Sequence, residues 1–194
     1  MARTKHNDKR LRLVEAADHL ILKNGFNITT LADIAKEADV PLGNVYYYFK
    51  TKYSILEAVI SHRLQLFKEQ TEAWTSLPSP KERLTALLED YITKKEHTAR
   101  FGCALGSLCQ ELGKLGSQIG NHSAKLMQEW VRYIEKQFIE LHHPTPLLAE
   151  EHLVASLQGA SLMTLTLKDP ALLQRQATQL AREIDQQFLL VKAA

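Results

Sequence analysis

The side chains best suited to hydrogen bonding with a partner lie between residues 30 and 52, where the sequence reads TLADIAKEADVPLGNVYYYFKTK. Hydroxyl, amide and ammonium groups recur there at short spacing, and one glycine leaves room for a partner to approach the backbone. These residues are Thr30, Gly43, Asn44, Tyr46, Tyr48, Lys50 and Lys52. Groups of these types bind phosphate oxygens and base edges in the grooves of DNA. The stretch therefore indicates nucleic-acid recognition.

Two short helices separated by a tight turn would position these groups. Thr30 followed by Asp33 resembles a capping box, which predicts that a helix begins at this threonine. The sequence DVP at residues 39–41 ends that helix, because proline disfavours helical backbone in the residue before it and is tolerated in a first turn. A third short helix is expected over residues 42–49. Together with the amphipathic helix that ends at Gly25, these helices form a helix-turn-helix unit.

The three consecutive tyrosines of the 42–49 helix allow two interpretations. Val45 and Phe49, four residues apart, are expected to face inward and to leave an outer face free. The tyrosines could all be packing residues, but consecutive helical positions cannot all face one core. We favour DNA contact for Tyr46 and Tyr48 and packing for Tyr47.

The sequence offers little for catalysis. A hydrolase built on Ser107 or Cys103 would need a base and an orienting group beside the nucleophile. Ser107 follows a glycine but lacks the second glycine of a nucleophile elbow, and no acid–base partner can be assigned to it. The eight histidines include no pair at metal-ligand spacing on one helix face. We expect no enzyme activity, no metal site and no cofactor, and keep a small helical hydrolase as the alternative.

Cysteine usage is typical of a reduced, cytoplasmic protein. Cys103 and Cys109 lie six residues apart on one expected helix and point to different faces, so they cannot bond to each other. Cys103 follows Gly102 in an expected first helical turn, where the helix dipole favours a reactive thiolate and would suit a sensor. The alternative, which we favour, is a small residue that packs at the helix start.

The rest of the chain also has the pattern of helices, so the predicted fold class is all-α. The expected ranges are 51–75, 81–98, 102–113, 123–141, 149–167 and 170–191. We divide the chain into a helix-turn-helix DNA-binding domain, residues 1–50, and a larger helical domain for ligand binding and dimerisation, residues 51–194. Residues 1–53 carry nine basic and six acidic side chains and the remainder carries 15 and 16, so the positive excess lies where phosphates would bind.

The larger domain contains two groups of candidate binding residues. Candidates for a ligand pocket, which could equally be core, are Phe67, Tyr91, Phe101, Cys103, Met127 and Trp130. Residues 153–167 form an uncharged stretch of 15 residues, too short and too polar to cross a bilayer. Its small residues would let two helices approach closely, so we expect a homodimer. The interface candidates are Ala155, Ser156, Gly159, Ala160 and Met163.

One combination of residues in the first sixty positions is specific. It consists of Ala16-Ala17, Gly25-Phe26, Thr30, Ile34-Ala35, Ala38, Val40, Gly43, Tyr46, Tyr48-Phe49, Lys52 and Leu56. With it, the chain resembles the tetracycline-repressor-like (TetR) family of regulators. The resemblance implies an all-helical protein of about nine helices. The first three would bind DNA, the fourth would link them to a ligand-binding body, and the last two long helices would pair in a homodimer.

Position by position, the resemblance also implies roles for single residues. Thr30 would contact a phosphate, Leu42, Gly43, Asn44 and Tyr46 would lie at the groove, and Tyr48 and Lys52 would contact the DNA backbone. Three positions depart from the family pattern. Asp39 replaces the usual glycine of the turn, Pro41 stands where a Ser or Thr cap is common, and Leu42 stands where a polar residue is often found. Base reading at Leu42 would then be apolar, for example against a thymine methyl.

The function that the resemblance implies is repression relieved by a ligand. Two copies would bind a palindromic operator in double-stranded DNA. An unknown small, mostly apolar effector would enter the helical body, change the spacing of the recognition helices and release the DNA. Activation in place of repression stays open, and a ligand-free architectural DNA binder is a further alternative. No membrane partner is expected.

Overall fold

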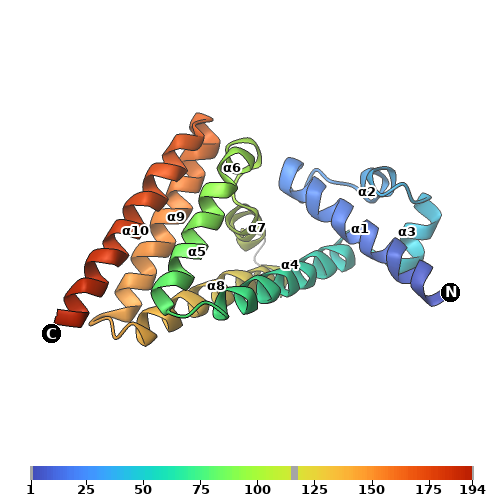
Figure 1. Ribbon diagram of the computed structural model, residues 1–194. Coiled ribbons are helices and arrows are strands. Elements are labelled where there is room, and N and C mark those ends of the chain that lie inside the picture. The colour runs from blue at the N-terminus through green and yellow to red at the C-terminus, as the bar shows by residue number, and fades with distance from the viewer. Residues whose placement is uncertain (1, 115–117, 194) are drawn as a thin grey trace. The chain divides into compact units, whose positions relative to one another are not determined.

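Helices make up all the regular structure in the part of the chain that is described. The computed structural model describes the backbone of residues 2–114 and 118–193, and the side chains of 8–114 and 120–188. The helices are α1 (Ala2–Asn24), α2 (Leu31–Glu37), α3 (Leu42–Tyr48), α4 (Lys52–Thr75), α5 (Pro80–Thr93), α6 (Lys95–Phe101), α7 (Ala104–Gly113), α8 (Gln118–Glu140), α9 (Pro146–Leu167) and α10 (Pro170–Ala193). The all-α prediction is confirmed (Figure 1).

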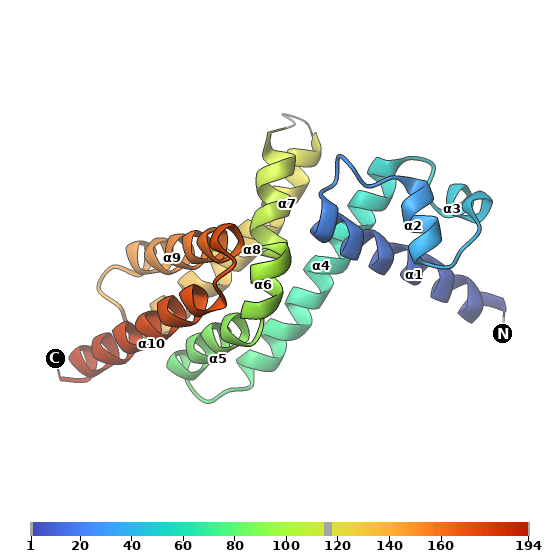
Figure 2. The same cartoon turned by 90° about the horizontal axis from the view of Figure 1, so that it is seen from above.

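Two units divide the chain, and the first contains the predicted helix-turn-helix. It comprises Met1–Phe67 and Ser107–Leu126. Much of its core comes from the first four helices: Leu13, Val14 and Ala17 of α1, Ile34 and Ala35 of α2, Val45 of α3, and Ile55, Leu56 and Val59 of α4. A mostly buried ion pair, Arg63 Nε to Asp18 Oδ1 at 2.5 Å, also joins α4 to α1. Figure 2 shows the ribbons of α1 and α4 crossing in this unit. These contacts hold α2 and α3 against α1 and α4.

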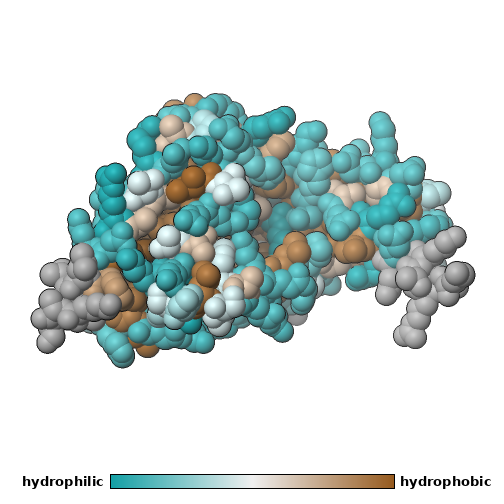
Figure 3. Space-filling model, in the orientation of Figure 1, coloured by the Kyte–Doolittle hydropathy of each residue, from teal (hydrophilic) through white to brown (hydrophobic). Residues whose placement is uncertain are grey.

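The second unit comprises Lys68–Gly106 and Met127–Ala194. In it, α10 packs along α5 and α9, and α6 packs on α9 (Figure 1). The largest fully buried side chains are Leu84, Leu87, Leu88, Ile134, Leu153, Leu157 and Leu173. Burial of each such side chain stabilises the fold by about 1.5–3 kcal/mol. Some apolar surface remains exposed among the polar side chains of this unit (Figure 3).

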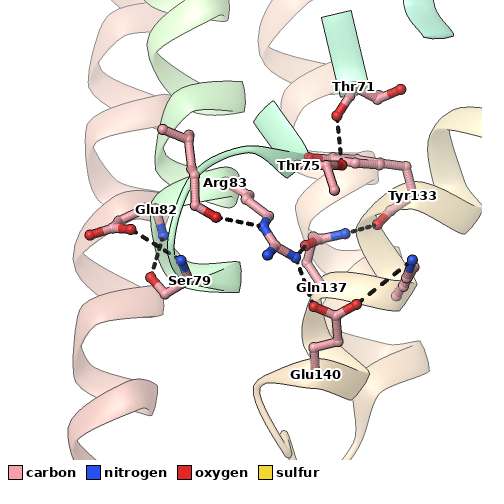
Figure 4. Close-up of polar contacts among 10 residues, drawn as sticks. Thr71, Thr75, Ser79, Glu82, Arg83, Tyr133, Gln137 and Glu140 are labelled. Carbon is pink, nitrogen blue, oxygen red and sulfur yellow. Dashed lines mark hydrogen bonds and ion pairs between the residues drawn. The ribbon is translucent and has the colours of Figure 1, made fainter. Parts of the chain in front are cut away.

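A polar clamp joins the α4–α5 connection to α8 in the second unit (Figure 4). Arg83 donates to Leu77 O at 3.2 Å, to Gln137 Oε1 at 3.3 Å and to Glu140 Oε2 at 2.8 Å. Gln137 in turn donates to Tyr133 O at 3.0 Å. Burial raises the pKa of the Tyr133 hydroxyl to about 12, against the opposing effect of the Arg83 charge. The clamp fixes α5 to α8 through one guanidinium.

Two expected helix boundaries were wrong. The helix expected over 81–98 is interrupted at Lys94, whose φ of −88° and ψ of 4° separate α5 from α6. Neither glycine nor proline marks this interruption, so the sequence pattern predicted one continuous helix across it. The helix expected at 123 begins at Gln118.

Candidate nucleic-acid interface

The predicted capping box at the start of α2 is confirmed. The Thr30 hydroxyl accepts from Asp33 N at 3.1 Å, and the Asp33 carboxylate accepts from Thr30 N at 2.9 Å. The carboxylate also accepts from the Thr30 hydroxyl at 2.6 Å. These hydrogen bonds favour the charged carboxylate and lower the pKa of Asp33. Thr30 itself is exposed at the helix N-terminus, where backbone N–H groups and the helix dipole favour an anion such as phosphate.

The turn between α2 and α3 depends on an arginine from α1. Asp39 adopts φ 51°, the left-handed conformation for which glycine is the usual residue. The Arg12 guanidinium donates to Ala38 O and Asp39 O and lies 3.7 Å from the Asp39 carboxylate. Arginine thus binds the carbonyls that end α2 and holds the turn without glycine. Pro41 is the N-cap residue of α3, with φ −54° and no side-chain hydrogen bond to the helix, as its sequence position predicted.

The expected inner face of α3 is confirmed, whereas the packing role of Tyr47 was wrong. Val45 is fully buried and Phe49 is 3% exposed. Tyr47 is 67% exposed, more than Tyr46 at 49%, and its ring meets the Tyr48 ring edge-on at 5.2 Å. Tyr47 therefore does not pack on the core of its unit. Its ring adds to the aromatic surface on the outer face of α3.

The N-terminal end of that outer face is the more open part. Leu42 is 40% exposed and Asn44 is half-buried. Gly43 is also exposed, and a Cβ built on it would meet no heavy atom within 4 Å. The fold of the chain therefore does not require glycine at position 43. A missing side chain at this point of the surface suits close approach of another molecule.

The two predicted lysines differ in their surroundings. Lys50 is exposed after α3. Lys52 is half-buried, donates to Asn27 O at 2.9 Å and lies 4.4 Å from the centre of the Phe26 ring. Burial lowers the pKa of Lys52, and the charge of Glu111 opposes that shift. Since an ammonium has three donors, the internal bond leaves capacity for a phosphate.

Comparison with known proteins places this geometry in a family. The family described as "Bacterial regulatory proteins, tetR family" matches residues 13–59 of this chain. A helix-turn-helix transcriptional regulator encoded in the lacX 3′ region of Lactococcus lactis subsp. lactis is 26% identical over 81% of this chain and 84% of its own length. The transcriptional repressor KstR2 of Mycolicibacterium smegmatis is 31% identical over 46% of this chain and 44% of its own.

The fold agrees over nearly the whole chain. A TetR-family transcriptional regulator from Streptomyces coelicolor superposes with a TM-score of 0.79 at 19% identity, covering 95% of this chain and 96% of that one. Residues 13–59 therefore match the DNA-binding segment of the TetR family, and the chain as a whole has the fold of TetR-family regulators. It is a DNA-binding transcriptional regulator. As the TetR relatives are regulators, the hydrolase built on Ser107 or Cys103 was the wrong alternative.

Three of the pocket candidates, Tyr91, Cys103 and Trp130, lie together in the second unit. The Tyr91 ring lies 5.7 Å from the ring of the buried Trp130. Burial, with the neighbouring Cys103 and Asp90, raises the pKa of the Tyr91 hydroxyl well above its usual value, and Gln158 hydrogen-bonds to that hydroxyl. The cluster thus combines aromatic surface with a few polar groups, as small-molecule sites do.

The other pocket candidates are placed separately. Phe101 is half-buried and its ring lies 5.0 Å from that of His97. Phe67 and Met127 are half-buried as well, the first in the first unit and the second in the second.

Cys103 immediately precedes α7 and acts as its cap. Its Sγ accepts from Gly106 N at 3.4 Å and from Gln158 Nε2 at 3.8 Å. Gly106 permits this arrangement, because a Cβ there would lie 2.2 Å from Gln158 Oε1. Both cysteines are free thiols, and Cys109 Sγ donates to Ser123 O at 3.2 Å.

The interface candidates of α9 separate into two sets. Ala155, Gly159 and Met163, spaced by four residues, are exposed on one face, with the exposed Leu162 beside them. Ala160 is 8% exposed and packs within its own protomer, and Ser156 is half-buried. Among the described residues, no helix is long and apolar enough to cross a bilayer.

Two functional candidates, Arg12 and Glu111, were missed from the sequence. Glu111 of α7 accepts from Phe26 N at 2.8 Å and Asn27 N at 2.9 Å. Each interaction joins residues far apart in the sequence, 26 or more positions for Arg12 and 84 or more for Glu111. No periodicity or short motif marks such a pair.

Proposed function

We propose that two copies of this chain bind a two-fold symmetric operator and repress transcription until a small molecule releases them. The observation that carries the proposal is the outer face of α3. Leu42, Gly43, Tyr46 and Tyr47 are exposed there while the inner residues Val45 and Phe49 are buried. A helix so anchored can enter the major groove without losing core contacts.

Readout by this face would be largely apolar. Leucine and tyrosine side chains contact thymine methyl groups, whereas Asn44 is suited to adenine through N6 and N7. Thr30, Tyr48, Lys50 and Lys52 are the proposed phosphate contacts around the groove. Together they imply binding whose affinity falls steeply with salt. Residues 1–50 are the proposed DNA-binding domain and residues 51–194 the ligand-binding and dimerisation domain.

The proposed dimer uses the exposed face of α9. Ala155, Gly159 and Met163 offer a charge-free stripe on which a second copy can approach closely. Two copies would then present two α3 helices, as a two-fold symmetric operator requires.

The proposed effector is small and mostly apolar, with one polar group that matches the hydroxyl and amide of the second unit's cluster. Tyr91, Trp130 and Gln158 support this choice, because aromatic walls with few polar groups are typical of such pockets. Repression is supported by the relative KstR2, which is named a repressor. Since bacterial DNA lies in the cytoplasm, we propose that the protein acts there.

Selection of duplexes from a random library by the full-length protein tests this function. We expect a short consensus with two-fold symmetry, bound by two chains. The slope of log K against log salt should be about −0.9 for each phosphate contacted. Enrichment of no consensus, or of a non-symmetric one, would contradict the proposal. Binding in the presence of a metabolite library then identifies the class of effector.

A further inference from the structure

Glu111 uses both carboxylate oxygens on one short stretch of backbone in the first unit. Oε2 accepts from Phe26 N at 2.8 Å and Oε1 accepts from Asn27 N at 2.9 Å. These N–H groups follow α1, where Gly25 has φ 87° and closes the helix. A Cβ on Gly25 would lie 3.3 Å from Glu111 Oε2, so glycine also lets the carboxylate come close. Charge-assisted bonds of this kind are about twice as strong as neutral ones.

The stretch held by Glu111 leads directly into the proposed DNA-binding helices. The buried Thr29 donates through its hydroxyl to Gly25 O at 2.8 Å, and Lys52 donates to Asn27 O at 2.9 Å. Thr30 follows as the cap of α2. The turn is thus held from α7, from α4 and from within itself, and its position sets where α2 begins.

The helix that carries Glu111 is also held at its other end. Cys103 caps α7, and Gly106 in the first turn packs closely against Gln158 of α9. Glu111 lies only five residues beyond Gly106 on the same continuous helix. Backbone hydrogen bonds between successive turns hold an α-helix of this kind together.

We infer that Glu111 is a positioning residue for operator binding, which fixes the orientation of the DNA-binding helices by tying the turn after α1 to α7. The inference rests on the proposed function, because it concerns the same α2 and α3. It adds that the two DNA-binding domains of a dimer must be held rigidly to match two half-sites. One base pair of spacing displaces a half-site by about 3.4 Å and rotates it by about 35°. A DNA-binding domain released from α7 would tolerate this change in half-site spacing.

The test compares full-length wild type with Glu111→Gln and Glu111→Ala on the selected operator and on versions with one base pair added or removed between half-sites. We expect wild type to lose about tenfold in affinity or more, equivalent to about 1.4 kcal/mol, on the altered spacings. Glu111→Ala should lose most of that discrimination. Glu111→Gln should lie between, because its amide oxygen still accepts one bond.

Two matched controls separate positioning from other effects. Glu89→Gln removes the same charge from an exposed site, and Gln110→Ala shortens the exposed neighbour on α7. Loss of a negative charge by itself favours binding to phosphates for every spacing, so reduced selectivity for spacing cannot come from charge. Both controls should discriminate spacing as wild type does.

Amide hydrogen exchange gives a second readout that needs no DNA. The Phe26 and Asn27 amides should exchange at least about tenfold faster in Glu111→Ala than in wild type, while α5 and α10 amides stay unchanged. Spacing selectivity within twofold of wild type in both variants would overturn the inference, as would unchanged exchange at both amides. If wild type selected no symmetric operator, the proposed function would fail instead, and the exchange rates would still decide whether Glu111 holds the turn.

Discussion

The guanidinium of Arg12, on α1, donates to the main-chain oxygen of Asp39 at 3.2 Å, in the turn between the two DNA-binding helices. The same group binds Ala38 O, the carbonyl of the residue that caps α2. The Asp39 carboxylate is fully exposed at 3.7 Å from the arginine. Main-chain bonds, not the ion pair, therefore make this contact important, since exposed ion pairs contribute little.

Removal of Arg12 should weaken both the turn and DNA binding. Arg12→Ala leaves the C-terminal carbonyls of α2 without a charged donor, and we expect a loss of about 1.5–3 kcal/mol in unfolding free energy. Urea denaturation measures this loss, and fluorescence anisotropy measures operator affinity. Arg132→Ala, which removes an exposed arginine paired with Glu129 on α8, is the control and should cost less than about 1 kcal/mol.

Asp39→Gly separates the two contacts of Arg12. It removes the exposed ion pair but keeps both main-chain bonds and relieves the left-handed φ of 51°. We expect unchanged or slightly higher stability, up to about 1 kcal/mol. A loss as large as that of Arg12→Ala would show that the carboxylate, and not the backbone, is what the arginine holds.

Gly43→Ala should separate folding from DNA binding. The open space around Gly43 accepts a methyl group. Because alanine favours a helix more than glycine does, Gly43→Ala should raise the unfolding free energy by at most about 0.5–1 kcal/mol. The same methyl would stand on the proposed groove-facing surface, and we expect operator affinity to fall about tenfold, or about 1.4 kcal/mol. Thermal unfolding and operator titration measure the two effects.

Gly113→Ala is the matched control, because a Cβ on that helical glycine also meets nothing within 4 Å. It should leave operator affinity unchanged. If Gly43→Ala bound the operator as tightly as wild type, the N-terminal end of α3 would not lie against DNA.

Much of the first unit follows from local signals in the sequence. The capping box of Thr30, the break at Pro41 and the inward Val45 and Phe49 each depend on residues within four positions of one another. The interruption at Lys94, by contrast, carries no glycine or proline signal.

The contacts that hold the DNA-binding helices could not be predicted in this way. Arg12 and Glu111 bind main-chain groups far away in the sequence, and any residue type has such groups. Tyr47 was misplaced for a related reason, because a helix of seven residues buries only a narrow stripe and leaves the neighbour of an exposed tyrosine exposed as well. Position along a helix fixes a face, but the width of the buried stripe depends on what packs against it.

The α9 face gives a prediction about assembly. Gly159→Arg places a long cation on the exposed stripe with Ala155 and Met163, where no atom of the same chain obstructs it. We expect wild type to scatter light as a particle of about twice the chain mass of 22.0 kDa, and the variant as a single chain. Gly113→Arg makes the same change at another open glycine and should stay dimeric. A dimeric Gly159→Arg protein would exclude this face.

Alkaline pH should destabilise the second unit through Tyr133. Its hydroxyl has a pKa of about 12 in the fold and about 10 when unfolded. The unfolded chain therefore loses this proton first, binds fewer protons than the folded chain, and gains relative stability as pH rises from about 10 to 12. Tyr133→Phe should flatten that part of the urea-stability profile, and an equally steep decline in the variant would assign it to other groups.

Cys103 gives the last prediction, which decides between a cap and a reactive sensor. Its Sγ accepts hydrogen bonds from Gly106 N and from Gln158, and a serine hydroxyl at the same place can accept them as well. We expect Cys103→Ser to keep wild-type stability and operator affinity, and Cys103→Ala to lose about 0.5–2 kcal/mol in unfolding free energy.

Alkylation completes this test. Mass spectrometry after treatment of native protein with N-ethylmaleimide should show Cys103 labelled more slowly than the same thiol in urea-unfolded protein, because Tyr91, Gly106 and Gln158 surround it. Operator binding should survive the treatment for as long as Cys103 stays unlabelled. Rapid labelling of the native thiol, with release of DNA that Cys103→Ser abolishes, would instead establish the sensor, since a modified sulfur could no longer cap α7 or stay against Gln158.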